Sequence, residues 1–303
     1  MGIVRSLAAL LLLTAAGAFA LLGSTAHWAD NMARTPGHVE EVVAPLIDDP
    51  VVLDALAGEL DRTIRERIPA SADRVPGLRA RIEQALTRAV GQVMEGEGVS
   101  EAWEETIGLT RDGLVAELDA YREDPSETPT IWLDLTPFAD LGRERIGSLT
   151  DTRLWTFAPG SLVEGDVRVA LGRIDAGVAT MASEALGLAR HWVWGYVAAA
   201  VLAALGLVIG TRSGRWIAWL IAAVAGLAAT FAARIALGSV DVASGDSLRA
   251  ALTGRATASV ADSLAAWMSA DLRLFGICIA VGAVGLVTTA LLSRSRERDP
   301  EGA

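Results

Sequence analysis

The side chains that most often bind metals or carry catalysis are few and scattered in this sequence. The three histidines are His27, His38 and His191, and no two of them have the spacing of zinc ligands. The single cysteine, Cys278, lies in an apolar run near the C-terminus, so an internal disulfide is excluded. The sequence therefore predicts no metal site.

Motifs for nucleophilic or nucleotide chemistry are also absent from the sequence. No GxSxG elbow surrounds a serine, and neither a P-loop nor a GxGxxG fingerprint follows a strand-like run. We therefore expect a protein that is not an enzyme. It should have no catalytic residues, no cofactor-binding residues and no cofactor.

Acidic clusters remain as candidate cation ligands. They are Asp48 with Asp49, Glu95 with Glu97, Glu101 with Glu104 and Glu105, and the run from Glu117 to Glu127. Several carboxylates can bind a hard divalent cation, but no EF-hand pattern is present. We favour solvated helix faces over a calcium site. The net charge of −11 is concentrated in residues 24–190, and this acidity argues against a nucleic-acid partner.

Apolar residues, 52% of the chain, are gathered into long runs. Four uncharged stretches are long enough to cross the roughly 30 Å hydrocarbon core of a membrane as helices. They are residues 6–23, 191–211, 216–233 and 274–293. The first stretch also resembles a cleavable signal peptide, although its length favours a retained anchor.

Arginine placement predicts the orientation of these spans. The arginines that flank them on one side are Arg5, Arg212, Arg215, Arg294, Arg296 and Arg298. The positive-inside rule makes that side cytoplasmic. We therefore expect a multi-pass plasma-membrane protein, in contact with membrane lipid, whose N-terminus and C-terminus are both cytoplasmic.

Within the spans, small residues recur at spacings that allow close helix contact. They are Gly206 and Gly210, Ala222 and Gly226, and Gly282 with Gly285. Alanine and glycine are abundant throughout these segments, so the pattern predicts contacts without naming a particular helix pair.

Residues 24–190 show helical periodicity for most of their length. Apolar stripes predict helices over 53–68, 78–93 and 100–121, the last with Ser100 as its N-cap and Trp103 in its buried face. Residues 131–135 read as a strand, followed by a short helix and a second strand at 154–157. This order predicts a small parallel βαβ unit, with Trp132 in the core.

Two further helices are expected beyond this unit. The stripe from Val167 to Met181 predicts a long helix from about Glu164 that continues into the second span without a break. In residues 238–273, Leu252, Ala256, Val260, Leu264 and Trp267 predict an amphipathic helix that leads into the last span.

The predicted fold is mainly α, with four transmembrane helices and an extracytoplasmic helical domain that contains a small βαβ element. The N-terminal anchor or signal peptide takes residues 1–23 and the extracytoplasmic domain 24–190. The second and third transmembrane helices take 191–237, and an extracytoplasmic amphipathic loop takes 238–273. The fourth transmembrane helix takes 274–293, and the cytoplasmic tail takes 294–303.

The order of these features resembles that of uncharacterised multi-pass integral membrane proteins of actinobacteria, which carry a helical ectodomain after the first span. The resemblance rests on residues 100–103 (Ser-Glu-Ala-Trp), 132–137 (Trp-Leu-Asp-Leu-Thr-Pro) and 258–264 (Ala-Ser-Val-Ala-Asp-Ser-Leu). It implies this architecture and no particular activity.

Two functions fit these expectations. The favoured one is a non-enzymatic cell-envelope protein whose acidic ectodomain binds another component, either an envelope protein or the cell wall. The alternative is a ligand sensor or an accessory subunit of a transporter.

Overall fold

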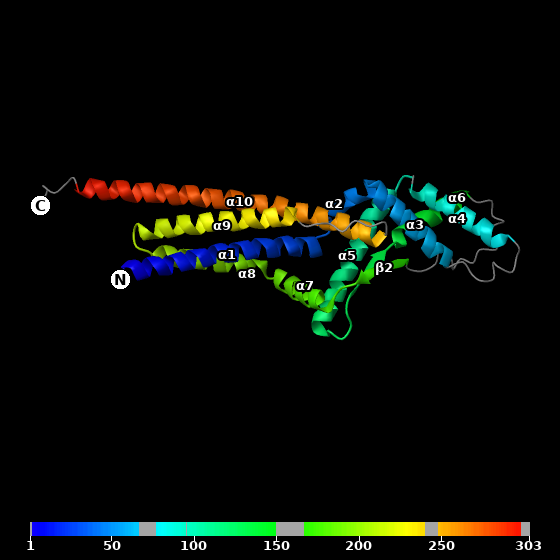
Figure 1. Ribbon diagram of the computed structural model, residues 1–303, viewed down its shortest axis with the longest axis horizontal. Coiled ribbons are helices and arrows are strands. Elements are labelled where there is room, and N and C mark those ends of the chain that lie inside the picture. The colour runs from blue at the N-terminus through cyan, green and yellow to red at the C-terminus, as the bar shows by residue number, and fades with distance from the viewer. Residues whose placement is uncertain (1, 67–76, 95, 150–166, 240–247, 298–303) are drawn as a thin grey trace. The chain divides into compact units, whose positions relative to one another are not determined.

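Long helices account for most of the computed structural model shown in Figure 1, which describes residues 2–66, 77–94, 96–149, 167–239 and 248–297. The chain divides into two compact units. Unit 1 comprises Met1–Asn31, Ala185–Val240 and Ala261–Ala303, and unit 2 comprises Met32–Glu184 and Asp241–Val260.

Unit 1 is built on four helices that are long and apolar enough to cross a membrane, as those of a multi-pass membrane protein are. They are α1 (Gly2–Arg34), α8 (Trp192–Ile209), α9 (Gly214–Gly238) and α10 (Leu248–Glu297), and Figure 1 shows them running alongside one another. Three of the four uncharged stretches lie within these helices, and the stretch 191–211 extends slightly beyond α8 at both ends. Many of their large apolar side chains face outward, which suits helices whose solvent is hydrocarbon.

The helices α1 and α8 approach so closely that their backbones touch. A Cβ added to Gly195 of α8 would lie 2.8 Å from the Cα of Gly23 in α1. Further along, a Cβ on Gly206 would lie 2.8 Å from Cγ of Leu13. Such distances are shorter than real Cβ contacts, so this interface requires glycine at both positions of α8.

The contact between α9 and α10 pairs glycines with tryptophans. A Cβ on Gly282 would lie 2.8 Å from the ring of Trp219, whose indole N–H donates to the carbonyl of Cys278 over 2.7 Å. Because Gly282 has no side chain, the carbonyl one turn before it stays accessible to that indole. Gly285 is covered in the same way by the ring of Trp216. The small residues noted in the sequence therefore do mark helix contacts.

Unit 2 is mainly helical and contains one small sheet. Its elements are α2 (His38–Val43), the 3₁₀ helix η1 (Ala44–Asp48), α3 (Pro50–Glu66), α4 (Leu78–Met94), α5 (Val99–Glu123), β1 (Thr130–Asp134), α6 (Thr136–Leu149) and β2 (Arg168–Arg173). The helix α7 (Ala176–Ala189) begins in unit 2 and ends in unit 1, and α10 also contributes residues to both.

The core of unit 2 surrounds Trp103 of α5, whose side chain is fully buried and donates from its indole N–H to the carbonyl of Val43 over 3.2 Å. Each of the stripes predicted for α3, α4 and α5 contributes residues to this core. Other buried members are Val52, Leu56, Leu60, Val90, Val93, Ile107, Leu133, Leu135, Phe138, Leu248 and Leu252. The predicted burial of Trp103 is thus confirmed.

The start of α5 differs from the prediction. The helix begins at Val99, and its N-cap is Gly98 with a φ of 89°, a left-handed conformation that glycine adopts without strain. The hydroxyl of Ser100 therefore does not cap the helix, and the prediction of Ser100 as N-cap was wrong.

The strands β1 and β2 are antiparallel, whereas the βαβ unit was predicted to be parallel with its second strand at 154–157. The order strand, helix, strand holds, but the second strand is residues 168–173, and the strand predicted at 154–157 lies outside the described residues. In residues 167–171 the larger apolar side chains Val167, Val169 and Leu171 alternate with Arg168 and Ala170, and Val167 and Leu171 also fit a helical stripe, so periodicity alone did not decide between strand and helix. Backbone pairing with β1 favours the strand.

The long helix predicted from Glu164 into the second span is also not formed. Besides β2, the chain breaks again between α7 and α8, where Arg190 and His191 are not helical. The predicted amphipathic helix within residues 238–273 is present, and it is continuous with the last span as the single helix α10 of 50 residues. Its Leu252 and Ala256 pack on the core of unit 2.

Replacing Trp103 with alanine tests the core of unit 2. Because its ring is fully buried, we expect Trp103→Ala to lower the free energy of unfolding by about 3–5 kcal/mol. The matched control is Trp132→Ala, whose ring is 41% exposed and whose loss should cost much less. Thermal unfolding of the full chain in detergent measures both, and equal losses would contradict this description of the core.

Candidate functional site

The residues that could ligate a metal lie on separate elements. His27 is in α1, His38 begins α2, and His191 lies between α7 and α8. Within the described ranges, no three histidine, cysteine, aspartate or glutamate side chains come together as a ligand set. Cys278 is half-buried in α10 as a free thiol.

Of the predicted acidic clusters, Glu95 lies outside the described residues, and the others divide between ion pairs, backbone contacts and exposed positions. Asp49 pairs with Arg255 of α10 at 3.1 Å, and Glu117 accepts the backbone N–H of Thr130 over 2.7 Å. Glu101, Glu104 and Glu105 are exposed on α5. These placements agree with solvated acidic faces on the helices.

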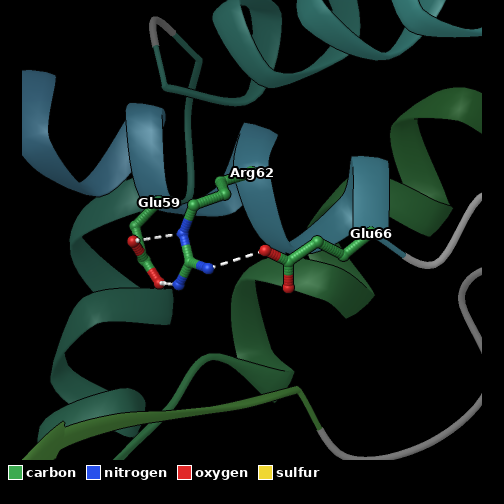
Figure 2. Close-up of polar contacts among 3 residues, drawn as sticks. All are labelled: Glu59, Arg62 and Glu66. Carbon is green, nitrogen blue, oxygen red and sulfur yellow. Dashed lines mark hydrogen bonds and ion pairs between the residues drawn. The ribbon is translucent and has the colours of Figure 1, made fainter.

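Arginine and glutamate side chains also form pairs along α3. Figure 2 shows Arg62 between Glu59 and Glu66, with a hydrogen bond of 2.7 Å to Glu66. The hydrogen bond to Glu59 and the charge of both carboxylates raise the pKa of the Arg62 guanidinium. Because Arg62 and Glu66 are exposed, the network contributes little stability and keeps the helix surface charged.

A buried ion pair joins α2 to α5. Nη1 of Arg111 lies 2.7 Å from Oε1 of Glu40, and both side chains are largely buried. A Cβ on Gly108 would come within 3.0 Å of the same glutamate oxygen. The glycine therefore leaves room for Glu40, and the pair fixes α2 against α5.

The edge of β1 is held along α5 by two side chains. Glu117 binds the N–H of Thr130, and the hydroxyl of Thr110 lies 3.1 Å from the N–H of Asp134. Trp132 stands midway between these two anchors. This arrangement covers one edge of the sheet, which would otherwise expose unpaired backbone groups.

Asp134 organises the end of the sheet. It accepts the N–H of Thr136 at 3.1 Å and the Nε–H of Arg168 on β2, also at 3.1 Å. Burial acts to raise the pKa of Asp134, but the hydrogen bonds from Thr136 and the Arg168 guanidinium outweigh it. The pKa of Asp134 therefore lies below its ordinary value.

Trp132 is exposed, so the prediction that it lies in the core was wrong. Alternate strand residues face opposite sides, and Leu133 takes the inward position. On α5, Leu109 is 41% exposed, and a Cβ on Gly113 would meet nothing within 4 Å. We call Leu109, Gly113 and Trp132 the Trp132 surface. Sequence reasoning missed it because a tryptophan in an apolar strand is more often buried.

Unit 1 contains a polar and aromatic cluster that the sequence did not predict. The indole N–H of Trp267 donates to Ser24 over 3.0 Å, and the Ser24 hydroxyl lies 3.0 and 2.9 Å from the two carboxylate oxygens of Asp271. The ring of His27 stacks on Trp192, with centroids 3.9 Å apart, and meets Trp267 edge-on. These contacts tie α1 to α8 and α10.

The cluster has the residue types of a catalytic triad without its geometry. Ser24 binds Asp271 directly, and His27 makes ring contacts in place of a hydrogen bond to the serine. A histidine that accepts the serine proton is what activates such a nucleophile. The arrangement is therefore suited to joining helices.

Comparisons with protein-family models, curated proteins and solved structures found no match to this chain.

The low pKa of Asp134 predicts a pH-dependent contribution to stability. A carboxylate whose pKa is lower in the folded state stabilises the fold above its unfolded pKa, and this contribution is lost as the pH falls through the folded value. At pH 7, Asp134→Asn should cost about 1–3 kcal/mol.

Melting of the full chain between pH 7 and pH 3 measures this effect. The difference between wild type and Asp134→Asn should shrink as the pH falls. The control is Asp140→Asn, which removes an exposed carboxylate on α6 that pairs within its own helix. A difference that stays constant across the pH range would contradict the assigned role of Asp134.

Proposed function

We propose that this chain is a non-enzymatic membrane protein of the cell envelope, and that its acidic unit 2 binds another envelope component through the Trp132 surface. The partner is a second envelope protein or a component of the cell wall. The proposal rests chiefly on one observation, the exposure of Trp132.

An exposed tryptophan on an ordered strand needs an explanation. Trp132 is 41% exposed, while its neighbours Leu133 and Leu135 are almost completely buried. Its strand is held on both sides, by β2 and by the side chains of α5, so the ring is presented on a fixed backbone. Rigid tryptophans of this kind supply much of the energy at protein interfaces.

The charge around this surface favours a partner with basic or hydrogen-bonding groups. Glu105 and Asp112 are exposed on α5, one turn to either side of Leu109. Arg168, across the sheet from Asp134, is exposed as well. An apolar centre with charged residues around it is the usual arrangement of an interaction site.

The proposal includes a location. Unit 2 lies outside the cytoplasm, both termini are cytoplasmic, and the membrane is the plasma membrane. Support comes from the arginines that flank the spans. Membership of the actinobacterial group is part of the same proposal, since only the order of features and the three segments at residues 100–103, 132–137 and 258–264 support it.

A second candidate function, a ligand sensor or an accessory subunit of a transporter, is favoured by α10. This one helix places Leu248 and Leu252 in the core of unit 2, and its later residues are long and apolar enough to span a membrane. A change in unit 2 that moved Leu252 would therefore act on a helix that continues into unit 1.

Replacing Trp132 with serine tests the interaction function. A tryptophan at the centre of an interface contributes about 2 kcal/mol or more, so Trp132→Ser should weaken binding roughly thirtyfold or more. The full chain is isolated from native membranes in mild detergent, and the amount of each co-purifying component is compared between variants.

The matched control is Val51→Ser, because Val51 is another exposed apolar residue of unit 2, 47% exposed. A component that remains with wild type and Val51→Ser but is lost from Trp132→Ser identifies the partner. If Trp132→Ser retains every component, the surface does not bind a partner and the proposal fails.

A further inference from the structure

Three arginines come together at one corner of unit 1. Nε of Arg5, at the start of α1, donates to the carbonyl of Ile209 at the end of α8 over 3.0 Å. The hydroxyls of Ser6 and Thr211 lie 3.2 Å apart. These two contacts fix the start of α1 beside the turn that carries Arg212 and Arg215.

The charges of this corner are not neutralised by the protein side chains that the structure describes. None of the described contacts of Arg5, Arg212 or Arg215 is with a carboxylate. Arg5 binds a carbonyl, and the guanidinium of Arg215 lies 5.5 Å from the ring centre of Trp216. Arg212 is exposed. Three positive charges close together, with no carboxylate partner among the described residues, create a positive potential that attracts anions.

Two hydrogen-bond donors in the same corner are unused. Nε of Arg215 and the indole N–H of Trp216 are both buried and have no hydrogen-bond partner. A buried donor without a partner costs free energy.

The start of α9 adds to the positive potential. This 25-residue helix begins at Gly214, and its N-cap, Ser213, makes no side-chain hydrogen bond to it. The N-terminal end of a helix carries a partial positive charge that favours phosphate groups. A Cβ on Gly214 would lie within 2.5 Å of the Ser6 hydroxyl, so this turn is packed tightly against α1.

An apolar groove lies next to the charged corner. It is shallow and open, and it is lined by Trp216 of α9 with Val281, Val284, Gly285 and Thr288 of α10, among others. Trp216 therefore contacts both features, Arg215 on one side and the groove on the other. A molecule with a charged head and an apolar chain matches this combination.

We propose that this corner binds the phosphate of an anionic phospholipid, with Arg5, Arg212 and Arg215 around the headgroup and an acyl chain in the groove beside Trp216. Guanidinium groups are well suited to phosphate because they donate two hydrogen bonds in parallel. The groove favours a lipid over free phosphate, which would leave it empty. The site is independent of the function proposed for unit 2.

Lipid binding by the full chain tests this site. The chain is delipidated in a neutral detergent, equal amounts of phosphatidylglycerol and phosphatidylcholine are added, and native mass spectrometry counts the lipid retained. Wild type should prefer phosphatidylglycerol. The double variant Arg212→Gln with Arg215→Gln should lose about twenty-fivefold in affinity for it, at about fivefold for each arginine near a membrane surface.

The matched control is Arg234→Gln with Arg273→Gln, which removes the same charge from exposed arginines that contact Ser269 instead. It should change the affinity by less than about twofold. The single variant Arg212→Gln changes an exposed side chain and should leave the fold intact. Its affinity for phosphatidylglycerol should fall about fivefold. Equal binding of the two lipids, equal effects of the two double variants, or displacement of the lipid by inorganic phosphate would each overturn the proposal.

Discussion

The structure depends first on the requirement that backbone polar groups in hydrocarbon be satisfied within the chain. An α-helix satisfies its own backbone polar groups, and four helices of this chain are long and apolar enough to cross a membrane. In a bilayer the apolar side chains gain little by packing on each other, so helix contacts depend on close fit. The glycines supply that fit: Gly195 lies against Gly23, Gly206 against Leu13, and Gly282 against Trp219.

Unit 2 buries its apolar side chains in one core. Its fold was predictable from the sequence where the apolar residues followed a single periodicity. The stripes of α3, α4 and α5 each fit only a helix, and Trp103 lies where its stripe placed it. Residues 167–171 fit two periods, and only their pairing with β1 over a long sequence distance made them a strand. Trp132 was misplaced for a related reason, since an apolar strand offers two faces and the sequence does not say which is buried. Gly98 caps α5 through its backbone conformation, which leaves no side-chain signal.

The candidate sites were less predictable than the fold because each joins residues that are far apart in sequence. Ser24 and Asp271 are 247 positions apart, and nothing local distinguishes either from other polar residues near a span. Arg5, Arg212 and Arg215 were recognised as markers of orientation, but their convergence depends on the contact between α1 and the end of α8. The exposed side chain of Trp132 and the convergence of these arginines, away from the carboxylates that the structure describes, are both properties of the folded chain. In the two proposals, unit 2 binds a protein or cell-wall component and unit 1 binds a lipid.

In the proposed topology four helices cross the membrane, and the chain between the first two spans lies on the far side from both termini. Reporters of compartment fused after Thr211, after Leu292 and near Ser126 test this topology directly. We expect a cytoplasmic signal at Thr211 and Leu292 and an external signal at Ser126. An external signal at Thr211 would contradict the four-span arrangement, and with it the location proposed for unit 2.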